Sequence, residues 1–146
     1  MTKKTNKKLN SPSNKCPECG TSMKEATGKL SFPVNGEEIS VSGLTFLKCQ
    51  KCQEMILRLD ESRKLRKQAI ELYRKKYHLL SGDEIRSLRE RNDLTQAQFA
   101  SLLRLGVNTI SRWESGRNVQ TSAMDVLLRL IRDVPGTLAY LQELAA

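Results

Sequence analysis

The residues of this chain whose type and spacing most clearly suggest chemistry are its four cysteines. They form two C-x-x-C pairs, Cys16 with Cys19 and Cys49 with Cys52, which residues 20–48 separate. Two thiolates at this spacing on a tight turn can bind one metal ion, and two such turns complete a tetrahedral set of ligands. The pattern therefore predicts one structural zinc ion (Zn²⁺) bound by these cysteines.

Other uses of the cysteines fit the sequence less well. Paired disulfides would require an oxidising compartment, which nothing else in the sequence suggests. A redox C-x-x-C would require a thioredoxin-like βαβ pattern around one pair, and the sequence lacks it. Catalytic zinc would need an open ligand position, and the single histidine, His78, lies far along the chain from both pairs.

A second group of functional side chains lies within residues 94–117, which predict two short helices joined by a tight turn at Gly106. Thr95 and Gln98 have the spacing of a capping box at the start of the first helix. The second helix is expected over residues 107–115. This arrangement is typical of a helix-turn-helix, whose second helix enters the major groove of DNA.

The second of these helices has one apolar and one polar face at 100° per residue. Its inner face is expected to carry Val107, Ile110 and Glu114, with Trp113 at the edge. Its free face carries the polar residues Asn108, Thr109, Ser111 and Arg112. Arginine pairs with guanine and asparagine with adenine, so this face predicts base recognition. The alternative is an ordinary helical hairpin in which Asn108 is only a helix cap.

The remaining elements must position these two groups. Between the cysteine pairs, apolar and polar residues alternate on either side of Asn35-Gly36, which predicts a small β-hairpin sheet. Residues 61–77 predict a basic helix, either a solvated connector or a basic face that lies along DNA phosphates or an acidic partner protein. A further helix is expected to begin around Ser81-Gly82-Asp83, and Ser122 is expected to cap another. Surplus apolar residues in this C-terminal part predict a homodimer interface.

These elements divide the chain into four predicted parts. Residues 1–14 are a disordered basic tail, 15–58 a four-cysteine zinc-binding β domain, 59–80 a basic helical connector, and 81–146 a helix-turn-helix domain for DNA binding and dimerisation. The predicted fold class is α+β with two domains, a small N-terminal β module followed by an all-α domain.

The charge of the chain points to a polyanionic partner. A chain of 146 residues with a net charge of +9 and a pI of about 9.6 attracts nucleic acid first. The apolar runs are shorter than a membrane span and the N-terminus lacks an apolar leader, so we expect a cytoplasmic protein without a membrane partner. We predict no enzyme, because the sequence contains no carboxylate cluster of metal-site spacing and no nucleophile motif.

The stretches LTQAQFA and GVNTISRWESG are similar to the helix-turn-helix of Xre-type (Xre/Cro-like) repressors, in which a glutamine early in the second helix holds a phosphate. Gln96 matches that place. From about Lys15 to its C-terminus, the chain resembles the MqsA family of antitoxins, which join a YgiT-type zinc finger to an Xre-type helix-turn-helix. The cysteine pairs and the GVN-x-x-SRWE segment are the specific parts of the resemblance.

The resemblance implies an antitoxin of a type II toxin–antitoxin system. Members bind and neutralise a cognate toxin, here expected to be an mRNA-cleaving ribonuclease. The toxin docks on the N-terminal domain, in which zinc is structural. Their C-terminal domain dimerises, reads a palindromic operator on double-stranded DNA and represses its own operon. Asn108 and Arg112 match the family's base-reading residues. The alternative is a free-standing zinc-finger and helix-turn-helix transcription regulator without a toxin partner.

Overall fold

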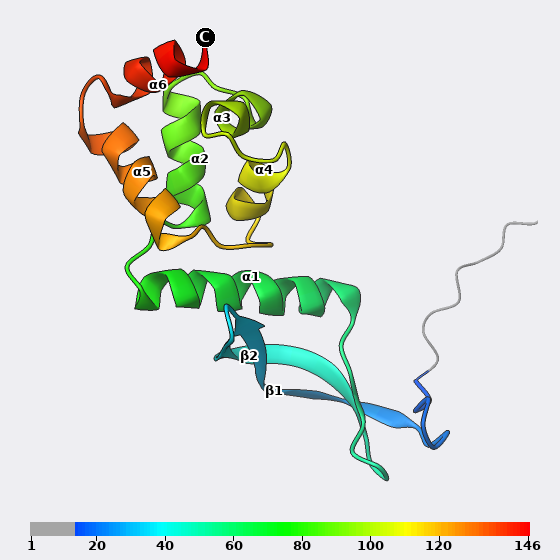
Figure 1. Ribbon diagram of the computed structural model, residues 1–146. Helices are drawn as coiled ribbons and strands as arrows, with labels where there is room; N and C mark the ends of the chain where they lie inside the picture. The colour runs from blue at the N-terminus through cyan, green and yellow to red at the C-terminus, as the bar shows by residue number, and fades with distance from the viewer. Residues whose placement is uncertain (1–13) are drawn as a thin grey trace, which may run out of the picture.

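A computed structural model describes residues 14–146 (Figure 1). Its strands are β1 (Met23–Val34), β2 (Glu37–Cys49) and β3 (Met55–Ile56). Its helices are α1 (Leu59–Lys76), α2 (Gly82–Arg91), α3 (Gln96–Leu102), α4 (Thr109–Glu114), α5 (Ser122–Asp133) and α6 (Thr137–Ala145). The strands form one antiparallel sheet in the order β1-β2-β3, and α2 to α6 form a separate helical domain, which confirms the predicted α+β fold. The predicted disordered tail lies outside the described residues, apart from Asn14.

β1 and β2 form a long hairpin that turns at Asn35-Gly36, as predicted. Both turn residues have positive φ, 50° and 81°, the conformation that a two-residue hairpin turn requires. The register pairs Val34 with Glu37 at the turn and Met23 with Cys49 at the open end. The hairpin therefore carries the second cysteine pair back beside the first.

α1 packs one face on this sheet, so it is more than a solvated connector. Leu65, Ala69 and Ile70 are buried on that face. They share a core with the sheet residues Val34, Ile39, Val41 and Leu44 and with Val119 from the loop before α5. Most of the exposed side chains on the rest of the helix are basic. α1 therefore has one buried apolar face and one exposed face that is mainly basic.

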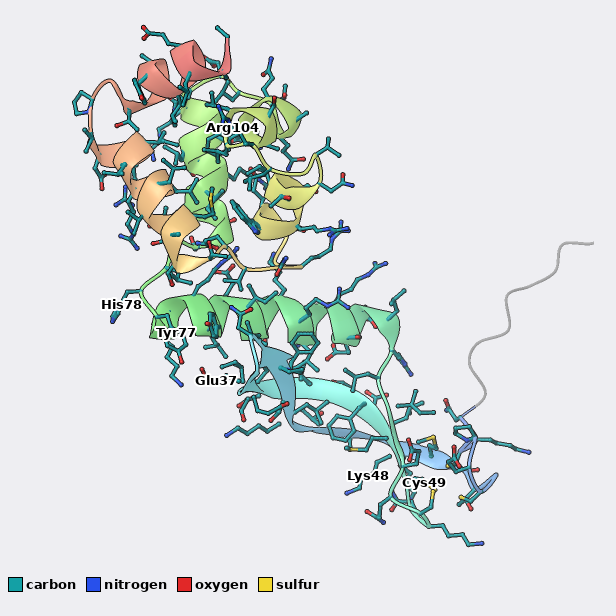
Figure 2. The ribbon with its side chains drawn as sticks, in the orientation of Figure 1. Glu37, Lys48, Cys49, Tyr77, His78 and Arg104 are labelled. Atoms are coloured by element: carbon teal, nitrogen blue, oxygen red, sulfur yellow. The ribbon has the colours of Figure 1, made fainter. Side chains whose placement is uncertain are left out.

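The C-terminal end of α1 is also tied to the hairpin turn. Glu37 accepts a hydrogen bond from the Tyr77 hydroxyl at 2.5 Å and pairs with Lys76 (Figure 2). The Lys76 and Tyr77 hydrogen bonds hold the pKa of Glu37 below its ordinary value. These contacts fix the direction of α1 across the sheet.

The caps of α2 and α3 lie where the sequence predicted. Ser81 caps α2, and Thr95 with Gln98 forms the predicted capping box of α3. The prediction for α5 was wrong by one residue, because Thr121 rather than Ser122 accepts the capping hydrogen bond. The core of the domain is formed by the buried residues Leu80, Ile85, Leu88, Phe99, Ala100, Leu103, Ile110, Trp113, Leu128 and Ile131.

The start of α4 differs from the prediction. Val107 was expected on the inner face of the helix, but it lies in the turn before it and is 66% exposed. The backbone N–H of Thr109 donates to the carbonyl of Gly106 at 3.0 Å, so these residues form a tight turn instead of a helical one. Trp113, expected at the edge, is buried in the core. Among the described residues, no helix combines the length and apolar character that crossing a membrane requires.

Candidate functional site

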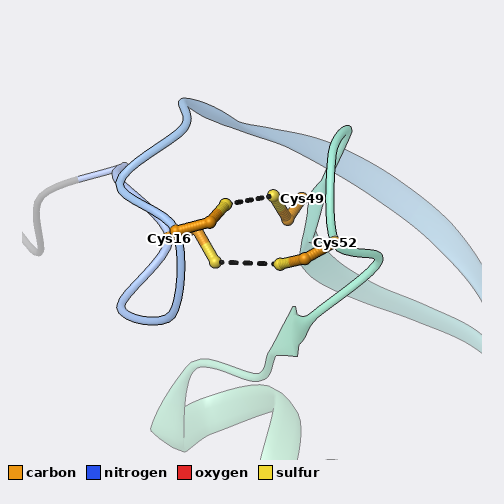
Figure 3. A group of neighbouring side chains, drawn as sticks. Cys16, Cys49 and Cys52 are labelled. Carbon is orange, nitrogen blue, oxygen red and sulfur yellow. Dashed lines mark hydrogen bonds between the residues drawn. The ribbon is translucent and has the colours of Figure 1, made fainter.

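The four cysteines converge at the open end of the hairpin (Figure 3). The Sγ atoms of Cys16 and Cys52 lie 3.4 Å apart, as do those of Cys19 and Cys49, and all four lie within 4.8 Å of one another. A disulfide would require about 2.05 Å, so these are free thiols. A tetrahedron with zinc–sulfur bonds of about 2.3 Å has edges of about 3.8 Å. The cluster therefore fits a tetrahedral metal ion.

Each cysteine pair lies in the same kind of turn. The backbone N–H of Cys16 donates to the carbonyl five residues later at 2.8 Å, and that of Cys49 does the same at 2.8 Å. The residue after the second cysteine of each pair has positive φ, +71° at Gly20 and +65° at Gln53. Because the two turns match, each directs both of its thiols toward the same point.

Hydrogen-bond donors around the sulfur atoms favour thiolates at two positions. The side chain and then the backbone of Thr21 lower the pKa of Cys19 to about 6, and the backbone N–H of Cys52 lowers the pKa of Cys49. The backbone of Glu54 acts to lower the pKa of Cys52, but the adjoining thiols and burial raise it to about 12. Adjacent thiolates repel one another, and a cation between the sulfurs removes that repulsion.

At the other end of the molecule, the buried carboxylate of Glu114 fixes the geometry of the helix-turn-helix. It accepts hydrogen bonds from Arg89 Nε at 2.6 Å, Gln96 Nε2 at 2.8 Å and Arg86 Nε at 3.4 Å. Burial acts to raise the pKa of Glu114, but the hydrogen bonds from Arg89 and Gln96 outweigh it and lower the pKa. One carboxylate thus connects α2, the first residue of α3 and the last residue of α4.

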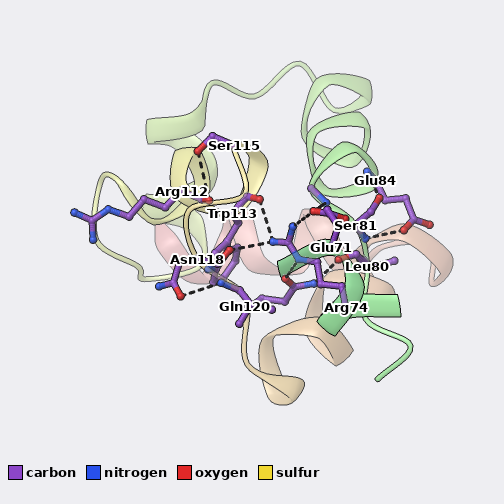
Figure 4. Close-up of polar contacts among 12 residues, drawn as sticks. Glu71, Arg74, Leu80, Ser81, Glu84, Arg112, Trp113, Ser115, Asn118 and Gln120 are labelled. Carbon is purple, nitrogen blue, oxygen red and sulfur yellow. Dashed lines mark hydrogen bonds and ion pairs between the residues drawn. The ribbon is translucent and has the colours of Figure 1, made fainter. Parts of the chain in front are cut away.

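The residues predicted to contact DNA lie on the free side of α4. Asn108 and Arg112 are exposed, and Thr109 and Ser111 are partly exposed. Asn108 is the N-cap residue, but its side chain makes no capping hydrogen bond. Within residues 14–146, Arg112 forms no ion pair, and its side chain extends away from the buried network (Figure 4). Gln96, the first residue of α3, is linked to α4 by its hydrogen bond to Glu114.

Sequence reasoning missed the residue that links α1 to this domain. Arg74 is 1% exposed, and its guanidinium donates to Gln120 Oε1 at 3.0 Å, to the Trp113 carbonyl at 3.0 Å and to the Asn118 carbonyl at 3.3 Å (Figure 4). The one available signal was its register, because Arg74 follows the buried Ile70 by four residues on the same face of α1.

The C-terminal helices expose apolar side chains on their outer surface. These residues, on α5, its C-cap and α6, are Val126, Leu130, Val134, Tyr140 and Leu144, each between 44% and 62% exposed. Exposed apolar side chains are common on protein–protein contact surfaces. The dimer interface predicted for this part of the chain stays a prediction.

Comparison with known proteins relates both ends of the chain to antitoxins. The family model described as the antitoxin component of the bacterial toxin–antitoxin system, MqsA, matches residues 14–143, which include the cysteine pairs and the helix-turn-helix. Antitoxin HigA-2 of Vibrio cholerae serotype O1 is 38% identical over 65 residues, 44% of this chain. The chain covers 62% of the length of that relative. From the family match over most of its length, the chain belongs to the MqsA family, the antitoxin components of bacterial toxin–antitoxin systems.

Proposed function

We propose that this antitoxin neutralises a cognate toxin, an mRNA-cleaving ribonuclease, and represses its own operon as a DNA-binding homodimer. Its family membership and its similarity to a second antitoxin support the first part and a regulatory role without catalysis. The observation that carries the second part is the free face of α4, where Asn108 and Arg112 are exposed while Ile110 and Glu114 are buried behind them.

In this mechanism α4 enters the major groove of double-stranded DNA. Arg112 pairs with a guanine and Asn108 with an adenine, while Thr109 and Ser111 offer hydroxyl groups to adjacent base edges or phosphates. Gln96, at the first turn of α3, binds a phosphate. Because its amide N–H is already bonded to Glu114, its side chain is oriented before DNA arrives.

The second protomer is proposed to bind through the C-terminal surface. Pairing through the exposed apolar residues of α5 and α6 removes them from water and presents two copies of α4. A twofold protein then reads a palindrome whose half-sites lie about 34 Å apart, one turn of DNA. Sedimentation of the full chain at micromolar concentration tests this, and a strict monomer would contradict it.

The cysteine cluster is proposed as one structural zinc site. Cys16, Cys19, Cys49 and Cys52 fill all four positions of the tetrahedron, so no position is open for water or substrate. In this role the ion supplies folding free energy to the end of the hairpin. The toxin is proposed to dock on this N-terminal module.

Co-expression with the adjacent small open reading frame tests the antitoxin proposal. We expect the neighbouring product to stop growth alone, to be harmless with this chain, and to co-purify with it through a tag. A harmless neighbour that does not co-purify would favour the free-standing regulator, which shares the DNA chemistry but has no toxin.

A further inference from the structure

A basic cleft lies between α1 and the end of α4. It has a volume of about 620 Å³ and is lined by Arg63, Lys64, Arg66 and Lys67 of α1 and by Arg117, which follows α4. The remaining lining residues are uncharged. The nearby acid Glu61 accepts a hydrogen bond from the Thr45 backbone at 2.9 Å and pairs with Lys64 at 3.9 Å.

Three of these cations have no partner elsewhere among residues 14–146. Lys64 donates to the Gly43 carbonyl at 3.2 Å, and Arg66 lies 5.9 Å from the ring centre of Phe32, so both lean toward the sheet. Arg63, Lys67 and Arg117, in contrast, form no ion pair or side-chain hydrogen bond in the described part of the chain. Arg63 and Lys67 are four residues apart and share one helix face.

The cleft has a fixed shape because α1 approaches α4 very closely. Gly116, at the end of α4, has a φ of +68°, and a Cβ there would lie 2.7 Å from Lys67 Cγ and 3.3 Å from Lys67 Cα. Only glycine allows this approach. The Lys67 stem therefore packs directly on the end of the proposed recognition helix, and its ammonium group lies at the cleft.

Arg74 also connects α1 to the end of α4, through buried hydrogen bonds. Its guanidinium donates to the carbonyls of Trp113 and Asn118, which lie at the end of α4 and in the loop after it. Gln120 accepts a third hydrogen bond from Arg74 and itself donates to the Leu80 carbonyl at 2.7 Å. Buried hydrogen bonds thus join α1 to the end of α4, and they place the basic side chains of α1 beside the helix that carries Arg112.

We infer that this cleft binds the sugar–phosphate backbone of DNA beside the groove that α4 enters. This inference rests on the DNA-binding function proposed above and extends its contact surface to α1 and, through α1, to the zinc-binding module. Arg63, Lys67 and Arg117 supply charges for adjacent phosphates, and Ser62 supplies a hydroxyl donor.

DNA fits the cleft better than an acidic protein because the cleft continues the proposed base-reading surface. Arg117 belongs to the cleft and follows Arg112 by five residues, and its backbone N–H donates to the Arg112 carbonyl at 2.9 Å. Nitrogen-tipped side chains extend from α1 and from the region of α4 on the same side of the molecule (Figure 2). The DNA backbone next to the major groove, where it passes the end of α4, would therefore lie beside these charges.

The test replaces Arg63 and Lys67 in the full-length protein with glutamine, which removes both charges and keeps the Lys67 stem against Gly116. The matched control is Lys24→Gln with Lys29→Gln, which removes two exposed charges from β1. Binding is measured between about 0.05 and 0.3 M salt to two duplexes of about three helical turns. One duplex carries the DNA directly upstream of the gene, and the other carries a scrambled sequence.

We expect the Arg63/Lys67 pair to weaken binding to both duplexes by roughly 10- to 100-fold at about 0.1 M salt. The slope of log affinity against log salt should fall by about 2 per bound protomer, because each lost phosphate contact releases about one counterion fewer. The ratio of affinities for the two duplexes should stay unchanged, and the control pair should change neither quantity.

The outcomes separate this inference from the proposed function. Equal losses in the test and control pairs would show a net-charge effect and overturn the cleft as a binding site. Unchanged DNA affinity with loss of co-purification of the neighbouring gene product would assign the cleft to an acidic protein instead. If the unmodified protein binds neither duplex, the DNA-binding function itself fails.

Discussion

The cysteine end of the hairpin and the helix-turn-helix domain hold their functional side chains by different means. At the hairpin end, the buried apolar cluster contains only Cys16, Met23, Leu47 and Cys49, with Cys19 and Ile56 packed against it. Half of these residues are the proposed metal ligands, so little of the cluster is independent of the site. The helical domain, in contrast, has ten buried core residues and the buried Glu114 network.

This contrast indicates where each end obtains its stability. A cluster as small as that of the hairpin end buries too little apolar surface to offset the ordering of its turns, so we expect it to depend on the proposed metal ion. The helical domain buries enough to fold without one. Between them, α1 rests on its own core with the sheet, so damage at the cysteine end should stop before it reaches α4.

The largest expected effect comes from breaking the metal site. Cys16→Ser or Cys52→Ser should abolish zinc binding and, with it, a contribution on the order of 10 kcal/mol to folding of the hairpin end. Lys51→Ala is the matched control, since only the backbone of Lys51 contacts Cys49. Zinc content and amide NMR spectra of the purified proteins measure the change.

The DNA affinity of the same serine variants tests whether the cysteine end and the helical domain are independent. Since α1 and α4 pack in cores that contain none of the cysteines, the serine variants should keep their affinity for DNA. Removing the ion from the unmodified protein with a chelator should give the same result. Loss of DNA affinity on either treatment would mean that the two ends are coupled more tightly than their separate cores suggest.

The second-largest effect is expected on the free energy of unfolding when the buried carboxylate of Glu114 is replaced. Glu114→Gln should cost about 3–5 kcal/mol of unfolding free energy, because Arg89 loses its charged partner while remaining largely buried. Urea unfolding measures it. Arg132→Gln is a suitable control, because its partners Asp133 and Glu84 are exposed.

The pH dependence of stability gives Glu114 a second readout. Its pKa is lowered in the folded protein from an ordinary value of 4.5, so it contributes stability that is present above pH 4.5 and is lost as the pH falls through the folded pKa. The glutamine variant should lack this part of the acid-dependent loss. Identical slopes below pH 4.5 in both proteins would contradict the assignment.

The third effect comes from the junction between the two ends. Arg74→Met should cost about 2–4 kcal/mol, because the carbonyls of Trp113 and Asn118 lose a buried donor. The helical domain and the sheet with α1 should then unfold in two separate steps instead of one. Lys75→Met, exposed on the same helix, should leave a single transition. A single transition in both variants would show that other contacts suffice.

The features predictable from sequence were those specified by residues close together in the chain. The C-x-x-C turns, the Asn35-Gly36 hairpin and the Thr95 capping box each depend on a few neighbouring residues, and the structure contains all three. The polar free face of α4 was predictable for the same reason, since helical periodicity alone separates Asn108 and Arg112 from Ile110.

What sequence reasoning missed depends on partners that are distant in the chain. Arg74 resembles the other basic residues of α1, and only its contacts with Trp113, Asn118 and Gln120, 39 to 46 residues away, distinguish it. The close approach of Lys67 to Gly116 likewise follows from tertiary packing. The exposure of Val107 was missed because the turn before α4 ends the helical register that would have buried it.

The smallest expected effect tests base reading by α4. Arg112→Ala should cost about 1–3 kcal/mol in binding to the upstream duplex and relax preference at one base pair. Its exposed side chain forms no ion pair and no side-chain hydrogen bond within residues 14–146, so unfolding by urea should be nearly unchanged. Competition assays with single-base variants of the duplex measure the preference.

Arg112 and the cleft residues should therefore fail in different ways. Loss of a base contact lowers affinity for the cognate sequence more than for scrambled DNA, whereas loss of the Arg63 and Lys67 charges lowers both alike. If Arg112→Ala instead weakens binding equally to both duplexes, Arg112 contacts a phosphate. Base recognition would then fall to Asn108 and its neighbours, and the specific surface would be confined to the first turn of α4.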